Sequence, residues 1–322
     1  MLRKGDLTQG GITGTLLHFT LPMLVGSFLQ QCYNIADTLI VGQCIGAGAL
    51  AAVGSAYTLM VFLISVLLGL AMGSGTVFSL HYGAGNHVAL RRSIFSSFVL
   101  IGIVTLILNV AVFIWLDPIL RLLQVPQDIY GMMRSYLWII FCGIVFTFIY
   151  NFYASLLRAV GDSVTPLWFL AVSVVLNIAL DLFFILQLDW GIQGAAAATV
   201  LAQGVAALGI IIYTYRRRPE LRWHHEDMCF DRTCLKEIAS FSTLTCVQQS
   251  VMNLGILMVQ GLVNSFGTAV MAAFAAAVKI DSFAYMPVQD FGNAFSTFIA
   301  QNCGAGEQER MRAGLRGAVK AS

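Results

Sequence analysis

The sequence has little charge. Asp, Glu, Lys and Arg together make up 11% of its 322 residues, whereas 58% are hydrophobic. A soluble domain carries about 25% charged residues. A water-soluble chain of this size could not bury so much apolar surface in one core, so the sequence predicts that lipid is its solvent. The net charge of +2 and the lack of a basic, aromatic-rich stripe exclude nucleic acid as a partner.

The motifs of common enzyme sites are also absent. The chain has no Gly-x-x-x-x-Gly-Lys-Ser/Thr loop to cradle a nucleotide phosphate. It has neither a Gly-x-Ser-x-Gly elbow nor a His-Glu-x-x-His helix. We therefore expect no enzymatic activity and no organic cofactor. The polar segment Met1 to Gly14 lacks a small-residue cleavage signature, so the first apolar helix is expected to stay in the mature chain.

The seven cysteines are odd in number and scattered through apolar stretches, which argues against a disulfide framework. One polar loop contains His224, His225, Cys229 and Cys234. Zinc sites use tighter, paired spacing, so we interpret this segment as a solvated loop rather than a metal site.

Eight apolar stretches are long enough to cross a bilayer as helices, which requires about 20 residues each. They run over residues 15–42, 50–80, 94–116, 131–157, 165–187, 192–215, 237–263 and 270–301. The sequence thus predicts an all-α polytopic membrane protein with about eight transmembrane helices. Six fall in an N-terminal lobe, residues 1–218, and two in an incomplete C-terminal lobe, residues 219–322.

The positive charges predict the orientation, because Lys and Arg concentrate in cytoplasmic loops. If the N-terminus is cytoplasmic, all 18 Lys and Arg residues except Arg121, Arg134 and Lys279 lie on the cytoplasmic side. The opposite orientation would invert this distribution. We therefore expect a multi-pass protein of the cell (inner or plasma) membrane with a cytoplasmic N-terminus.

The sequence also repeats itself at an offset of 221 residues. This offset aligns the loop Gly83-Ala84-Gly85 with Gly304-Ala305-Gly306, and Arg91 with Arg312, without a gap. Six spans separate the two copies, so both have the same orientation in the membrane, as parallel repeats do. The second copy lacks counterparts for four helices. We expect a truncated product, or a second chain that supplies the missing part.

The first span carries a polar stripe that ends at Asp37. Gln30, Tyr33 and Asn34 precede Asp37 by seven, four and three residues, and these spacings place the side chains on one helix face. A carboxylate at the bilayer centre costs about 2.5–3.5 kcal/mol on insertion scales, which makes Asp37 a functional candidate. The alternative is a structural cluster with a permanently protonated Asp37. Earlier in the span, Pro22 predicts a bend.

The fifth span repeats this pattern. Asn177 and Asp181 are four residues apart on one helix face, and Thr199 of the next span could face them across a short connection. Two carboxylates, an amide and a hydroxyl are hard oxygen ligands, so the set suits H⁺ or Na⁺ rather than zinc or copper. No spacing rule brings Asp37 and Asp181 together; that they meet is a prediction.

The eighth span contains Lys279, Asp281 and Asp290. Lys279 and Asp281 are two residues apart and do not face each other. Lys279 and Asp290 share a face but lie about 16 Å apart at 1.5 Å per residue. They are candidates for substrate binding in the second lobe, and the alternative is a structural role opposite the missing helices.

Several short motifs are distributed over essentially the whole chain. They are Pro22, Tyr33-Asn34-Ile35-Ala36-Asp37-Thr38 with Val41-Gly42, Gly83-Ala84-Gly85, Arg158-Ala159-Val160-Gly161-Asp162, Asn177-x-x-x-Asp181, and Gln301-Asn302-Cys303-Gly304-Ala305. In combination they resemble the multidrug and toxic compound extrusion (MATE) family, and most closely its DNA-damage-inducible-protein-F-like branch.

This resemblance implies two six-helix lobes around a central cavity that opens alternately to the two sides of the membrane. It implies export of organic, often cationic, compounds in exchange for H⁺ or Na⁺. It further implies that Asp37, Asn177, Asp181 and Thr199 form a cation or proton site and that the first helix bends at Pro22. Members of the family have twelve helices, whereas this chain ends after the eighth.

We therefore expect a secondary active antiporter for small organic compounds, acting as a monomer unless another chain supplies the missing helices. A first alternative is a lipid-linked-oligosaccharide flippase of related architecture. Such a cavity should carry several cations for a pyrophosphate group, but Lys279 is the only Lys or Arg away from the end of a predicted span. A second alternative is a membrane fragment that transports nothing.

Overall fold

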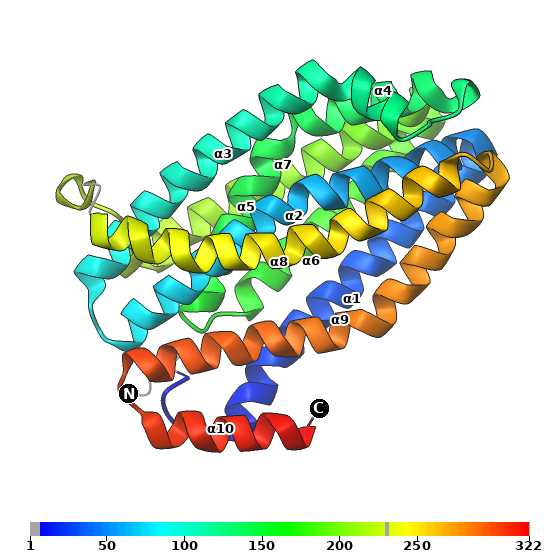
Figure 1. The fold of residues 1–322 in the computed structure, drawn as a ribbon. Coiled ribbons are helices and arrows are strands. Elements are labelled where there is room, and N and C mark those ends of the chain that lie inside the picture. Colours follow the sequence, from blue (N-terminus) through cyan, green and yellow to red (C-terminus); the bar gives the residue numbers. More distant parts are fainter. Residues whose placement is uncertain (1–6, 229–231, 322) are drawn as a thin grey trace.

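The computed structural model describes residues 7–228 and 232–321, and within these ranges every regular element is a helix. The helices are α1 (Ile12–Cys44), α2 (Ala47–Gly83), α3 (His87–Leu122), α4 (Gln127–Cys142), α5 (Ile144–Ala159), α6 (Val164–Leu182) with a π-helical extension η1 (Phe183–Gln187), α7 (Gly191–Arg217), the 3₁₀ turns η2 (Pro219–Leu221) and η3 (His225–Asp227), α8 (Arg232–Asn264), α9 (Thr268–Gly304) and α10 (Gln308–Ala321). Figure 1 shows a single elongated bundle in which α2 occupies the middle.

The helices have the length and composition of membrane spans. Six of those described are long and apolar enough to cross a bilayer, and the number is eight when each of two bent helix pairs is taken as one span. Large apolar side chains face outward along them; Leu106, Ile114 and Val175 are all at least 65% exposed. Such a surface is stable against lipid. The predicted all-α, membrane-spanning fold class is confirmed.

The predicted span 131–157 consists of two helices, α4 and α5, that are bent by 50° relative to each other. The break is at Gly143, which lies against Val200 of α7. A Cβ atom added at Gly143 would lie 2.5 Å from a Val200 methyl carbon. Glycine therefore allows α7 to approach the break more closely than any other residue would. By contrast, α1 continues as one helix through Pro22.

The internal repeat is visible in the backbone. Helices α1 and α8 both have 33 residues, and α2 and α9 both have 37. Gly46 and Gly267 precede α2 and α9 with φ angles of 117° and 94°, in the region that favours glycine. After these helices, Ala84 donates to the Leu80 carbonyl and Ala305 to the Gln301 carbonyl, both at 3.0 Å. The offset seen in the sequence thus corresponds to a duplicated backbone.

The two copies meet where α2 and α9 end. A Cβ atom at Gly83 would lie 2.0 Å from the Gln301 carbonyl oxygen, and one at Gly304 would lie 2.0 Å from the Leu80 carbonyl oxygen. The 221-residue offset relates these two contacts to each other. Glycines at both positions let the two backbones touch, as small residues do between membrane helices.

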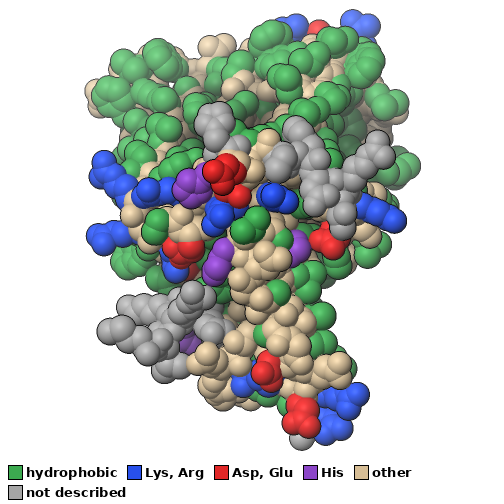
Figure 2. Space-filling model, turned by 90° about the vertical axis from the view of Figure 1, so that its left-hand side faces the viewer, with side chains coloured by type: hydrophobic (Ala, Val, Ile, Leu, Met, Phe, Trp, Pro, Cys, Tyr) green, Lys and Arg blue, Asp and Glu red, His purple; other side chains and the backbone are tan. Residues whose placement is uncertain are grey.

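We call the end of the bundle where α1 begins and α2 ends the N-terminal end. The N-terminal segment is held there between α9 and α10. The Leu7 N–H donates to Gln301 Oε1 (3.1 Å), and Arg310 of α10 donates to the Gly10 carbonyl (2.9 Å). Figure 2 shows that charged and histidine side chains gather across this face, with hydrophobic side chains on either side. Helix α10 was not among the predicted spans, and it begins where the repeat places a counterpart of His87, the first residue of α3.

Candidate functional site

Four of the predicted polar residues come together inside the first six spans. Asp37 comes from α1, Asn177 and Asp181 from α6, and Thr199 from α7. All four are buried, with exposures of 7%, 2%, 0% and 6%. The four-residue spacing on α6 points Asn177 and Asp181 in one direction. The short connection 188–190 after η1 then brings α7 back beside α6.

The two carboxyl groups adjoin each other, since the side chains of Asp37 and Asp181 are within hydrogen-bonding reach. The Asn177 amide, oriented so that both of its ends are satisfied, donates to Asp181 Oδ2 (2.7 Å) and accepts from the Thr199 N–H (3.1 Å). Tyr33 places its hydroxyl 3.2 Å from Thr199 Oγ1 and so connects α1 to α7. The polar groups contributed by Tyr33, Asn177 and Thr199 are thus hydroxyls and amides.

No described Lys or Arg forms an ion pair with Asp181. Two ionised carboxylates at hydrogen-bonding distance repel each other strongly when both are buried. One proton shared between them, or one monovalent cation bound to both, removes that repulsion. The arrangement can thus exchange a single positive charge.

The structure adds a residue that the sequence did not indicate. Tyr136 of α4 is 4% exposed and lies near Asp37, Asp181 and Tyr33. A lone tyrosine in an apolar span carries no positional signal, because most buried tyrosines only fill space. Its place at this site depends on how α4 packs against α2 and α7, which periodicity cannot provide.

The remaining predicted residues lie elsewhere. On α1, Asn34 donates to Gln31 Oε1 (2.8 Å), and Gln30 is half-buried. On α9, Asp290 is 9% exposed and within hydrogen-bonding reach of Ser27 of α1, whereas Asp281 is exposed. The side chain of Lys279 lies outside the described residues.

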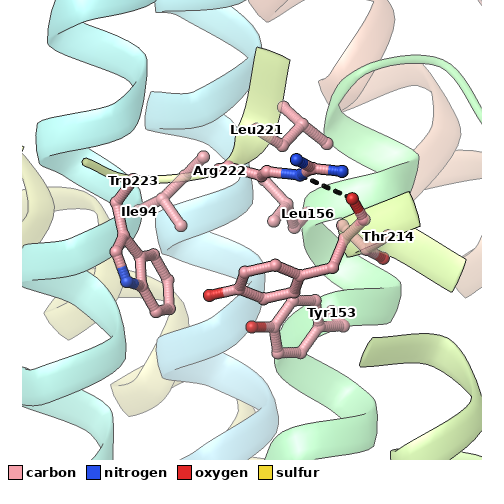
Figure 3. A pocket seen from close by; sticks show the side chains of 8 residues that line it. Ile94, Tyr153, Leu156, Thr214, Leu221, Arg222 and Trp223 are labelled. Carbon is pink, nitrogen blue, oxygen red and sulfur yellow. Dashed lines mark hydrogen bonds between the residues drawn. The ribbon is translucent and has the colours of Figure 1, made fainter. Parts of the chain in front are cut away.

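The loop with the histidines and cysteines is partly packed rather than wholly solvated. Among the described residues no group of three or more His, Cys, Asp or Glu could hold a metal ion; Cys229 lies outside them. Cys234 is buried and 3.1 Å from Ser93 Oγ. Trp223 packs edge-on against Phe95 of α3. Figure 3 shows Trp223, Leu221 and Arg222 lining a small pocket with Tyr153 and Ile94, where Arg222 donates to the Tyr215 carbonyl.

An ion pair fixes the end of this loop. Asp227 Oδ2 accepts from Arg91 Nε of α3 (2.7 Å) and from the His224 N–H (3.0 Å). Burial raises the pKa of Asp227, but the His224 N–H and the Arg91 guanidinium outweigh burial and hold this pKa below its ordinary value. Asp227 therefore stabilises the folded state above the unfolded pKa of about 3.9, and this contribution is lost as the pH falls through the lower folded value.

We expect Asp227→Asn to lower the free energy of unfolding at pH 7 by roughly 1–3 kcal/mol, because a largely buried, charged hydrogen bond is lost. The difference from the wild type should shrink as the pH falls below about 4. Thermal unfolding in detergent at several pH values measures both effects. The control is Asp189→Asn, an exposed site with φ of 52° that asparagine tolerates. A pH-independent difference would contradict the ionic explanation.

Comparison with known proteins gives a consistent result. The family model for MatE matches residues 22–183 and 245–322. The chain is 32% identical over 317 residues to the probable multidrug resistance protein YpnP of Bacillus subtilis, covering 96% of this chain and 69% of that protein. It is 30% identical over 305 residues to the probable multidrug resistance protein YoeA of the same organism, covering 92% and 66%. The chain thus spans about two thirds of the length of these relatives.

Among solved structures, an outward-facing multidrug resistance MATE family transporter of the MOP superfamily superposes with a TM-score of 0.90. The superposition covers 100% of this chain and 71% of that one at 22% identity, a level that shows a shared fold.

Proposed function

We propose a function from one premise, which the family match establishes: the chain belongs to the MatE family of membrane transporters. We propose that it exports drugs or other organic, often cationic, compounds in exchange for H⁺ or Na⁺. The observation that supports this most directly is the pair of buried carboxyl groups, Asp37 and Asp181, from two different helices. That the chain is a truncated member of the DNA-damage-inducible-protein-F-like branch stays a prediction.

In this proposal the carboxyl pair alternates between an empty, doubly charged state and a state with one bound H⁺ or Na⁺. Asn177 and Thr199 hold Asp181 in place, and Thr199 also contacts Tyr33 on α1. A bound ion removes the repulsion between α1 and α6, so it favours a different position of α1. Pro22 lacks the backbone N–H that would stiffen α1, and we propose that α1 bends there.

Exchange requires that the ion and the organic compound stabilise different states of the carrier. We assign the organic cation to the space between α1 and α9, where Asp290 is buried beside Ser27. One Asp290 carboxyl oxygen has no hydrogen-bond partner among the described residues. A buried carboxylate of this kind is costly unless a cation approaches it.

We also propose that the protein lies in the plasma membrane with the N-terminal end of the bundle on the cytoplasmic side. Arg91, Arg218, Arg222 and Arg310 all lie at this end, on the face where Figure 2 shows the charged side chains. Cytoplasmic surfaces of membrane proteins concentrate Lys and Arg.

Gradient-driven transport tests the proposal. The chain is reconstituted into liposomes that contain ethidium, and a pH gradient or a Na⁺ gradient is imposed separately. We expect one of the two gradients to drive ethidium across the membrane, and the effective gradient identifies the coupling ion. Liposomes without protein and liposomes with an ionophore that collapses the gradient are the controls. If neither gradient moves ethidium faster than in these controls, coupled export is contradicted.

A further inference from the structure

The break between α4 and α5 lies beside a small pocket that has three polar side chains in its lining. A break in a membrane helix frees backbone groups that protein or water must satisfy. Here Asn109 of α3 donates to the Phe141 carbonyl at 2.8 Å, two residues before the break at Gly143. Next to the break, α2, α4, α5 and α7 enclose a small pocket, which we call the Gly143 pocket.

Apolar side chains line the Gly143 pocket except at three positions, Thr147, Thr199 and Gln203. The Thr147 hydroxyl donates to Gln203 Oε1, which connects α5 to α7 across the pocket. Thr199 and Gln203 are one turn apart on α7 and therefore share its face. A buried water needs two to four polar partners and room for one molecule. The pocket offers three such partners in a space of that size.

The pocket shares one residue with the carboxyl pair. Thr199 lines the pocket, and it also contacts Tyr33 through its hydroxyl and Asn177 through its N–H. A single side chain thus separates the Gly143 pocket from the groups around Asp181.

Further polar side chains follow Thr147 along α5, in the direction away from Asp181. Asn151, four residues after Thr147, donates to the Thr147 carbonyl at 2.8 Å. Ser155, four residues further on, donates to the Ala71 carbonyl of α2 at 2.7 Å. One face of α5 carries Thr147, Asn151 and Ser155. This row of polar side chains therefore runs toward the N-terminal end of the bundle. With Gln203 of α7, these residues form a row of four polar side chains. Fewer would be enough to hold α5 against α7.

We propose that the Gly143 pocket binds water and is the passage through which the coupling ion reaches Asp37 and Asp181 from the N-terminal end. Hydroxyl and amide oxygens of Thr147, Gln203 and Thr199 would replace part of the hydration shell of the ion or hold the water that carries a proton. This inference rests on the proposed function of the carboxyl pair. It assigns the route by which the coupling ion enters and leaves that pair.

Hydroxyl-radical footprinting of the full chain in lipid nanodiscs tests whether the pocket is wet, because radiolysis converts bound water into radicals where the water lies. Phe141 lines the pocket at 1% exposure, and Phe78 is a matched core phenylalanine at 0%. We expect Phe141 to be oxidised several-fold faster than Phe78. In Gln203→Leu the two rates should become equal, whereas Thr105→Val, which removes a buried hydroxyl bonded within α3, should leave the difference unchanged. Equal rates in the wild type would overturn the proposal.

A kinetic measurement separates the passage from the binding site. Intrinsic fluorescence after a rapid pH or Na⁺ jump reports how fast the pair is loaded. We expect Gln203→Leu to slow loading about tenfold, the equivalent of one lost hydrogen bond, without moving the midpoint of the titration. An unchanged rate in Gln203→Leu would overturn the passage and leave the carboxyl pair as the ion site. If Asp181→Asn responds to the jump as the wild type does, the proposed function itself fails.

Discussion

Replacement of Asp181 by asparagine is expected to abolish ion-driven transport. The substitution keeps the shape and the contact with Asn177 but removes the group that we propose exchanges its charge. We expect the gradient-driven rate to fall at least about a hundredfold, the equivalent of about 2.8 kcal/mol. Ethidium movement in liposomes measures this rate for the wild type and the variant at equal protein content.

The same substitution should leave the fold intact. Removing one of two adjoining buried carboxylates removes repulsion, so the free energy of unfolding at pH 7 should stay the same or rise. Asp117→Asn is the matched control, because Asp117 pairs with Arg134 at a largely exposed position, where such pairs contribute about 0–1 kcal/mol. Full transport by Asp181→Asn would remove the carboxyl pair from the mechanism. Loss of transport in both variants would show that the assay responds to damage of any kind.

Gly304→Ala should produce the largest loss of stability of any single methyl group added to α9. The new carbon would lie 2.0 Å from the Leu80 carbonyl oxygen, and this oxygen belongs to the backbone of α2, which cannot move aside as a side chain can. Inserted carbon atoms in packed interiors cost about 1–3 kcal/mol or more. We expect a lower melting temperature and less folded protein after extraction into detergent.

Gly292→Ala in the same helix is the control, because a Cβ atom there meets nothing within 4 Å. It should be neutral or stabilising, by up to about 1 kcal/mol, since alanine favours helices over glycine. Gly83→Ala should behave like Gly304→Ala. The double variant should cost less than the sum of the two, because both substitutions separate the same pair of helices. Equal effects of Gly304→Ala and Gly292→Ala would contradict the close approach of α2 and α9.

The membrane-spanning helices and the repeat could be predicted because both depend on local patterns. Apolar runs of sufficient length identify spans whatever their neighbours, and the loops around Gly85 and Gly306 keep the same glycine where the backbone needs a positive φ. The pairing of Asn177 with Asp181 on one face follows from helical periodicity. That Asp37 lies next to them depends on how α1 packs against α6, so it entered only as a prediction.

Features that depend on packing were not predictable from the sequence. Gly143 lies in an apolar stretch that reads as one continuous span, and the close approach of Val200, which requires glycine at the break, is evident only from the structure. Trp223 and Asp227 lie in a polar segment that suggests a solvated loop. Their partners, Phe95 and Arg91, are more than 100 residues away in the sequence, so no local pattern reveals them.

The duplicated backbone of α1–α2 and α8–α9 contributes to the proposed ion site in only one of its copies. At the 221-residue offset, the position of Asp37 is occupied by Met258, a side chain that cannot hold a charge. The two hairpins therefore share a backbone but carry their acidic side chains at different positions: Asp37 on α1, and Asp281 and Asp290 on α9. In the proposed mechanism the first hairpin supplies Asp37 to the ion site, and the second hairpin supplies Asp290 to the organic cation.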